Sequence, residues 1–92
     1  MQPYTFHTDV GHGWLEVPVQ EVKDLGIGED ISGYSYISND WKTVYLEEDC
    51  DAQRFIDAKL EKHKVKITWV YEQHNDDCFI RRLNNIYLTK EV

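Results

Sequence analysis

The sequence predicts a single α+β domain in which an antiparallel sheet of five to six strands carries two helices on one face. Three observations support this fold class. Ninety-two residues leave room for one hydrophobic core, so 1–92 is expected to form one domain. Stretches of period-two alternation are interrupted by two segments with helical spacing, in the order β-β-α-β-β-α-β-β. The connections are short, which favours hairpins over parallel crossovers.

The N-terminal quarter supplies a strand pair and a short helix. Residues 4–7 alternate aromatic with polar side chains, and residues 14–17 resume as a second strand after a turn in which two glycines flank His12. Pro18 suits the first position of a helix because its φ is fixed and it has no amide donor. Apolar residues follow with helical spacing, and Gly26 is the expected end of this helix.

The middle of the chain predicts a hairpin followed by the second helix. Residues 33–37 and 43–46 show strand character on either side of a polar turn, which predicts antiparallel pairing. Apolar side chains then recur with helical period as far as about residue 62. Asp49 or Asp51 is the expected cap of this helix, because a carboxylate there accepts hydrogen bonds from the free amides of the first turn.

The last third of the chain is predicted to contain two strands and one further apolar segment. Residues 65–71 give the cleanest period-two pattern in the chain, which places four large side chains on the core face. These four are Val65, Ile67, Trp69 and Tyr71. Residues 78–81 are expected to pair back as the next strand after a polar turn. The tail around 86–88 is expected either to add an edge strand or to lie over the sheet.

The chain has a net charge of -7, and residues 1–62 hold all of the acidic excess. Such an excess repels phosphate backbones and steers a small protein toward basic surfaces on other proteins. Direct binding of nucleic acid is therefore not expected. Arg81 and Arg82 beside Phe79 form a local basic and aromatic spot, for which a solvated strand face is the preferred interpretation.

The sequence also indicates in which cellular compartment the protein is expected. No run of apolar residues reaches the roughly 18 needed to cross a bilayer, and the first ten residues lack the basic head and apolar stretch of a signal peptide. A cytoplasmic protein without a membrane partner is expected. Cys50 and Cys78 are too few and too far apart for a disulfide framework, so we expect reduced, partly buried thiols.

Two histidines and an aspartate cluster in the first turn, as His7-x-Asp9-x-x-His12. Zinc and ferrous iron accept two imidazoles and a carboxylate, and His74 could add a fourth donor if the two loops meet. The spacing is not an established metal signature, so bonding of these side chains to nearby backbone is the preferred interpretation. The alternative is a metal-dependent enzyme or small-ligand binder built on His7, Asp9, His12 and His74. No other cofactor is expected.

An acidic run, Glu47-Glu48-Asp49-Cys50-Asp51, lies at a junction between a strand and a helix. A helix N-terminus lowers the pKa of a cysteine, but four adjacent carboxylates raise it and should prevail, which argues against a nucleophilic Cys50. The run lacks the spacing of a calcium loop. Helix capping and a packed thiol are therefore preferred to a Mg²⁺ or Ca²⁺ site.

Aromatic residues gather in the predicted hairpin, beside carboxylates. Exposed rings supply much of the binding energy at protein interfaces, and acids steer toward basic partners. A protein-binding patch and an ordinary aromatic core are both compatible with this pattern. The candidate patch residues are Tyr34, Tyr36, Trp41, Tyr45, Glu47 and Glu48.

Three stretches carry a resemblance to a group of proteins. HTDVGHGWLEVP at 7–18, LGIGEDISGYSY at 25–36 and VYLEEDCDA at 44–52 resemble a group of small uncharacterised proteins encoded in bacterial genomes, phages and plasmids. The resemblance covers about the first 58 residues. It implies an autonomous small domain carried by mobile elements, and it implies no activity, cofactor or catalytic residue.

The leading hypothesis is a small, acidic, non-enzymatic protein-binding module of mobile-element type. It would act as an inhibitor or adaptor of a host or phage protein, for example by covering a basic nucleic-acid-binding surface of a defence enzyme. The metal-dependent alternative on the histidines remains open. A homodimer formed by pairing of edge strands is a third hypothesis.

Overall fold

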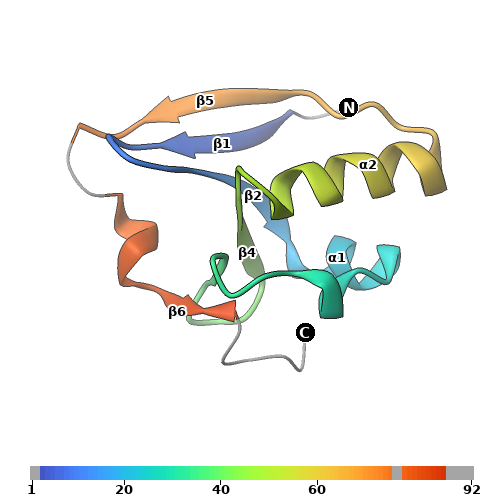
Figure 1. Ribbon diagram of the computed structural model, residues 1–92, viewed down its shortest axis with the longest axis horizontal. Helices are drawn as coiled ribbons and strands as arrows, with labels where there is room; N and C mark the ends of the chain where they lie inside the picture. The colour runs from blue at the N-terminus through green and yellow to red at the C-terminus, as the bar shows by residue number, and fades with distance from the viewer. Residues whose placement is uncertain (1–2, 76–77, 87–92) are drawn as a thin grey trace.

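The computed structural model describes residues 3–75 and 78–86 and shows a six-stranded sheet with two α-helices packed on one face (Figure 1). The order of strands and α-helices is the predicted β-β-α-β-β-α-β-β. The strands and α-helices are β1 (Tyr4–Thr8), β2 (Gly13–Pro18), α1 (Val19–Leu25), β3 (Tyr36–Ile37), β4 (Thr43–Glu47), α2 (Asp51–His63), β5 (Trp69–Gln73) and β6 (Asn84–Asn85). Two short 3-10 helices, η1 (Gly28–Asp30) and η2 (Phe79–Arg82), complete the described elements.

The sheet is mostly antiparallel, with one parallel pair. Its strand order is β5-β1-β2-β4-β3-β6, and only the β1–β5 pair runs parallel among the described strands. The predicted antiparallel sheet is confirmed except for this one pair, which the sequence did not indicate. Helix α2 is about 20 Å long, so it carries the chain from β4 back across the sheet to the far edge, where β5 enters beside β1 in the same direction (Figure 1).

The main core lies between the helices and the sheet. Val19, Val22 and Leu25 form the buried face of α1, and Gly26 ends this helix with a φ of 70° in the left-handed region, as the sequence predicts. Pro18 is the last residue of β2 and precedes the first helical residue. The main core consists of Phe6, Leu15, Val17, Val19, Val22, Leu25, Ile27, Ile31, Ile37, Val44, Leu46, Ala52, Phe55, Ile67 and Ile86.

Helix α2 begins without the predicted carboxylate cap. Cys50 occupies the N-cap position, and within the described residues it makes no side-chain capping bond. Asp51 is fully buried inside the first turn and accepts hydrogen bonds from the Ser32 amide and from the hydroxyls of Ser32 and Ser35. The prediction of a cap at Asp49 or Asp51 is therefore wrong, because Ser32 and Ser35, in the loop between η1 and β3, bring their own donors to the Asp51 carboxylate.

Strand β5 starts later than predicted, at Trp69. Val65, Ile67 and Trp69 contribute to the main core as expected. Tyr71 is 69% exposed and does not. The difference follows from position, because β5 is an edge strand paired only with β1 among the described strands.

The opposite face of the sheet is covered by residues 78–83, which we call the covering segment. A strand was predicted at 78–81. That prediction is wrong, because residues 79–82 form η2, which lies apart from both α-helices in Figure 1. Trp14 and Tyr45 from the sheet, Cys78 and Ile80 from this segment, and partly buried Tyr36 and Leu83 make a second, smaller core. Burial alternates along this segment, with Cys78 and Ile80 buried and Phe79 exposed, because the 3-10 helix buries one side.

The C-terminal edge of the sheet is the two-residue strand β6, which pairs with β3. Ile86 after it is buried in the main core, and residues 87 and 88 of the predicted tail segment lie outside the described residues. Across 3–75 and 78–86, no helix is both long enough and apolar enough to cross a membrane.

Candidate functional site

A pocket of 320 Å³ opens beside η2, on the side of the sheet that the second core occupies. Three aromatic rings and two carboxylates contribute to its wall, together with a thiol, an imidazole and a guanidinium. The lining residues are His12, Trp14, Gly33, Tyr34, Tyr36, Glu47, Asp49, Cys50, Arg81 and Asn85. Tyr34 is 72% exposed, so its ring stands at the mouth of the pocket. A cavity of this size with convergent polar groups is the usual form of a binding site.

The carboxylates of the pocket differ in their surroundings. Glu47 is buried, and its Oε1 accepts hydrogen bonds from the Asp49 amide at 3.0 Å and from the Cys50 thiol at 3.6 Å. Burial, reinforced by the charge of Asp49, raises the pKa of Glu47 above its ordinary value. Asp49, by contrast, is exposed. The pocket therefore has one buried carboxyl group, which holds its proton to higher pH than an ordinary glutamate, and one exposed carboxylate.

Cys50 is a packed thiol. A hydrogen bond with Ser32 lowers its pKa, but burial and the charges of Asp51 and Glu47 outweigh that bond and raise the pKa above the ordinary cysteine value. The direction that the acidic run predicts is thus confirmed. A thiol with a raised pKa carries little thiolate at neutral pH and is a poor nucleophile.

Trp14 forms the floor between the pocket and the second core. It is 2% exposed, and its indole Nε1 has no hydrogen-bond partner among the described residues. The Arg81 guanidinium lies over the Trp14 ring, 5.4 Å from its centroid. An indole N–H buried without an acceptor is unusual in a native protein.

Asp9 fixes Arg81 and the covering segment. Its side chain is fully covered and accepts hydrogen bonds from Arg81 Nε at 2.6 Å and Nη2 at 2.9 Å. It also accepts the amides of Gly11 and His12 at 3.0 Å and that of Cys78 at 3.1 Å. The Arg81 guanidinium and these amides hold the pKa of Asp9 well below its ordinary value. The interpretation of Arg81 as part of a solvated strand face is therefore wrong.

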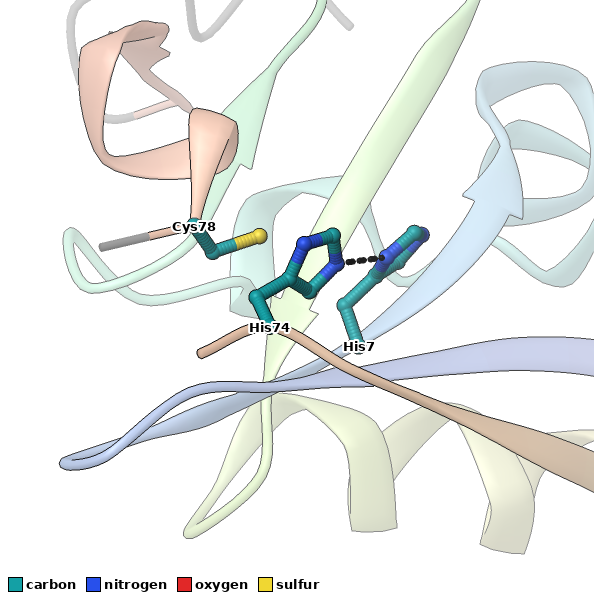
Figure 2. Close-up of side chains that lie close together, drawn as sticks. All are labelled: His7, His74 and Cys78. Carbon is teal, nitrogen blue, oxygen red and sulfur yellow. Dashed lines mark hydrogen bonds between the residues drawn. The ribbon is translucent and has the colours of Figure 1, made fainter. Parts of the chain in front are cut away.

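A histidine pair lies next to this segment. His7 Nδ1 and His74 Nε2 are 3.1 Å apart, and the two rings stack with centroids 5.3 Å apart (Figure 2). On its other side, His7 Nε2 is 2.8 Å from Glu16 Oε1. The rings of Tyr45 and Phe79 contact His7 edge-on. The imidazole of His7 is thus almost entirely enclosed.

Cys78 completes a cluster with the two histidines. Within the described residues, one donor atom from each of His7, His74 and Cys78 lies within 4.8 Å of the others (Figure 2). Burial raises the pKa of the Cys78 thiol, so the sulfur is protonated when nothing binds it. Figure 2 shows the thiol approaching the His74 ring from the side opposite His7.

The predicted metal set assembles only in part. His7 and His74 meet, as the sequence reasoning allowed, but the Asp9 carboxylate is engaged by Arg81 and three amides. His12 lines the pocket beside Trp14 instead. Cys78 takes the third position. Sequence reasoning missed it because 78–81 was assigned to a strand, although a spacing of four residues from His74 was available as a signal.

The predicted aromatic patch is divided between surface and core. Tyr34, Trp41 and Glu48 are exposed, with Trp41 at 45%. Tyr45 and Glu47 are buried, so the Tyr45 ring takes no part in an open surface. Three patch members line the pocket, namely Tyr34, Tyr36 and Glu47. Tyr34 and Tyr36 thus border a hollow, whereas Trp41 lies on the surface outside it and Tyr45 lies in the second core.

Comparison with known proteins gives no match to a protein-family model, a curated protein or a solved structure.

Proposed function

We propose that this protein is a small non-enzymatic binding module that docks on a basic partner protein, with the pocket receiving a lysine or arginine side chain of that partner. The observation that carries the proposal is the pocket itself, in which the rings of Trp14, Tyr34 and Tyr36 stand together with the carboxylates of Glu47 and Asp49. Aromatic faces attract cations, and carboxylates bind them directly.

The charge of the whole chain supports the same partner. A net charge of -7 draws a basic surface toward the protein at long range and repels nucleic acid. Arg81, the basic group in the pocket wall, is paired with Asp9, which offsets its repulsion of an incoming cation. By covering a basic surface, the module would act as an inhibitor or adaptor of a host or phage protein.

The position of the pocket along the chain also supports it. Its wall draws on all three stretches that carry the resemblance described above. His12 and Trp14 come from 7–18, and Gly33 with both tyrosines comes from 25–36. The acidic groups and Cys50 come from 44–52. A protein-binding role also suits Cys50, whose raised pKa disfavours nucleophilic chemistry.

The test uses arginine and its uncharged isostere. Isotope-labelled protein is titrated with the peptide acetyl-Gly-Arg-Gly-amide and, separately, with the same peptide carrying citrulline, while backbone amide signals are followed by NMR. We expect the arginine peptide to shift the signals around Gly33 and Cys50. Citrulline has the same shape without the charge, so its binding should be weaker by about threefold to thirtyfold, the range set by a cation–π contact.

One tyrosine variant and one tryptophan variant test where the arginine peptide binds. Tyr34→Ala should weaken arginine binding by a similar factor, because its ring stands at the pocket mouth. Trp41→Ala is the matched control, since Trp41 is an exposed aromatic outside the pocket lining. Equal binding of the two peptides, or an equal loss in both variants, would contradict the proposal.

A further inference from the structure

We propose that His7, His74 and Cys78 form a binding site for Zn²⁺, separate from the pocket. The cluster brings two imidazole nitrogens and one sulfur together from three places in the chain: β1, the residue after β5, and the residue before η2 (Figure 2). This donor set is one that zinc accepts in proteins, usually with a fourth ligand from solvent or a carboxylate.

The spacing of the donors fits a tetrahedral ion. Ligand bonds of about 2.0–2.1 Å to nitrogen and about 2.3 Å to sulfur place two nitrogens about 3.3 Å apart and a nitrogen and a sulfur about 3.6 Å apart. His7 Nδ1 and His74 Nε2 are already 3.1 Å apart. One donor atom from each of the three residues lies within 4.8 Å of the others, so the donors would have to approach one another by little more than about 1 Å.

Glu16 orients the His7 ring for this role. A carboxylate only accepts hydrogen bonds, so the 2.8 Å contact with Glu16 Oε1 assigns the proton of neutral His7 to Nε2. The lone pair of His7 Nδ1 then accepts a hydrogen bond from His74 Nε2 in the metal-free protein. On metal binding, His74 carries its proton on Nδ1 instead, which frees both facing nitrogens for the ion. Metal-binding histidines commonly donate their second N–H to a carboxylate in this way, which fixes the ring and strengthens the ligand. Glu16 is thus a positioning residue of the site.

Glu72 supplies a candidate fourth ligand. Its Oε2 lies 3.9 Å from His7 Nδ1, and its side chain is mostly exposed and can rotate. Two imidazoles, one thiolate and one carboxylate favour zinc over Mg²⁺ or Ca²⁺, which prefer oxygen donors alone. On binding, the Cys78 thiol releases its proton to solvent and the sulfur bonds to the ion.

The site would fasten the covering segment to the sheet. His7 lies in β1, while Cys78 begins the segment that forms the second core and carries Arg81 into the pocket wall. Without an ion, the contact between the two histidine rings and the Asp9 hydrogen bonds hold this region. With an ion, three additional bonds would join β1, the end of β5 and η2.

The experiment is a direct metal titration. Full-length protein without affinity histidines is stripped of metal and titrated with Zn²⁺ against a chromophoric chelator, and in parallel with Co²⁺ under reducing conditions. We expect one ion per chain and a thiolate-to-cobalt charge-transfer band. Cys78→Ser should abolish that band, whereas the matched variant Cys50→Ser should retain it.

Variants of the histidines and of Glu16 form the second part of the experiment. His74→Gln should lower Zn²⁺ affinity by more than about a hundredfold, since loss of an outer-shell partner alone costs about tenfold to hundredfold. Glu16→Gln should fall in that lower range, and His12→Gln, which changes a histidine outside the cluster, should leave the affinity unchanged.

Folding of each variant is checked by its amide NMR spectrum. His74 is only partly buried, so its substitution tests the site even if Cys78→Ser unfolds the chain. The proposal is overturned if the folded protein takes up no stoichiometric Zn²⁺. It is also overturned if binding survives His74→Gln, or if Cys50→Ser or His12→Gln abolishes it.

Discussion

Substitution of Asp9 by asparagine should destabilise the protein strongly, although it preserves the shape of the side chain. Asparagine keeps one oxygen, which can still accept the amides of Gly11 and His12. Its NH₂ group then faces Arg81 Nε and the Cys78 amide, both of which are donors. Two donors lose their acceptor, and the partly exposed guanidinium of Arg81 loses the carboxylate charge that balances it.

The magnitude follows from these losses. A buried donor left without an acceptor costs about 1–3 kcal/mol, and breaking a buried ion pair costs about 3–5 kcal/mol. Arg81 is partly exposed and can recover some hydration, so we expect a loss of about 3 kcal/mol in the free energy of unfolding. In a domain of this size that corresponds to a fall of about 12–24 °C in melting temperature.

The assay is urea unfolding of the wild type, Asp9→Asn, Arg81→Met and the double variant, followed by tryptophan fluorescence. Because the two side chains interact directly, the double variant should lose less than the sum of the single variants. A loss below about 1 kcal/mol in Asp9→Asn, or strict additivity, would refute the assignment of Asp9 as the anchor of the covering segment.

The same pair makes stability depend on pH. The pKa of Asp9 is lower in the folded protein than its ordinary value of 3.8, so the folded state releases this proton more readily than the unfolded state. The stabilisation is fully present above about pH 5 and declines as the pH falls below the unfolded value. The difference in stability between the wild type and Asp9→Asn should therefore be constant near neutrality and narrow in acid.

Three further predictions test local features. Gly26→Ala should lower the free energy of unfolding by about 1 kcal/mol, measured by thermal unfolding, because Gly26 has a φ of 70°. Lys64→Gly should raise it by up to about 1 kcal/mol, because Lys64 ends α2 with a φ of 57°. A change of the same sign in both variants would contradict this account. Cys50 should react with iodoacetamide at neutral pH more slowly than free cysteine because its pKa is raised, and a rate equal to or above that of free cysteine would contradict it. If self-association occurs through the β5 edge, Val70→Lys should abolish any concentration-dependent sedimentation, because Val70 is exposed on that strand; dimers that persist would exclude this edge.

The order of elements was predictable because each depends on local periodicity. The α1 stop at Gly26, the hairpin of β3 and β4, and the apolar face of α2 all follow from spacing within a few residues. The parallel position of β5 was not predictable in this way, because it depends on how far α2 carries the chain. A short apolar run such as 78–80 also cannot distinguish a strand from a 3-10 helix that buries one side.

Several residues of the candidate sites were predictable from the sequence, but the contacts between them were not. His7 and His74 were identified as potential ligands, and Tyr34 with Glu47 as part of a binding region. Their true neighbours are set by long-range contacts. Asp9 is matched to Arg81 across 72 positions in the sequence, and that pairing removes Asp9 from the ligand set while placing Cys78 near the histidines.

The covering segment is therefore the part of the fold on which both proposed sites depend. Asp9 holds the Cys78 amide and the Arg81 guanidinium with one carboxylate, so it positions a zinc ligand and a wall of the pocket together. Asp9→Asn at a temperature where it remains folded should weaken both Zn²⁺ and arginine-peptide binding. If the variant loses stability but keeps both affinities, the packing of Ile80 and Leu83 against the sheet is sufficient to place the segment, and Asp9 contributes only to stability.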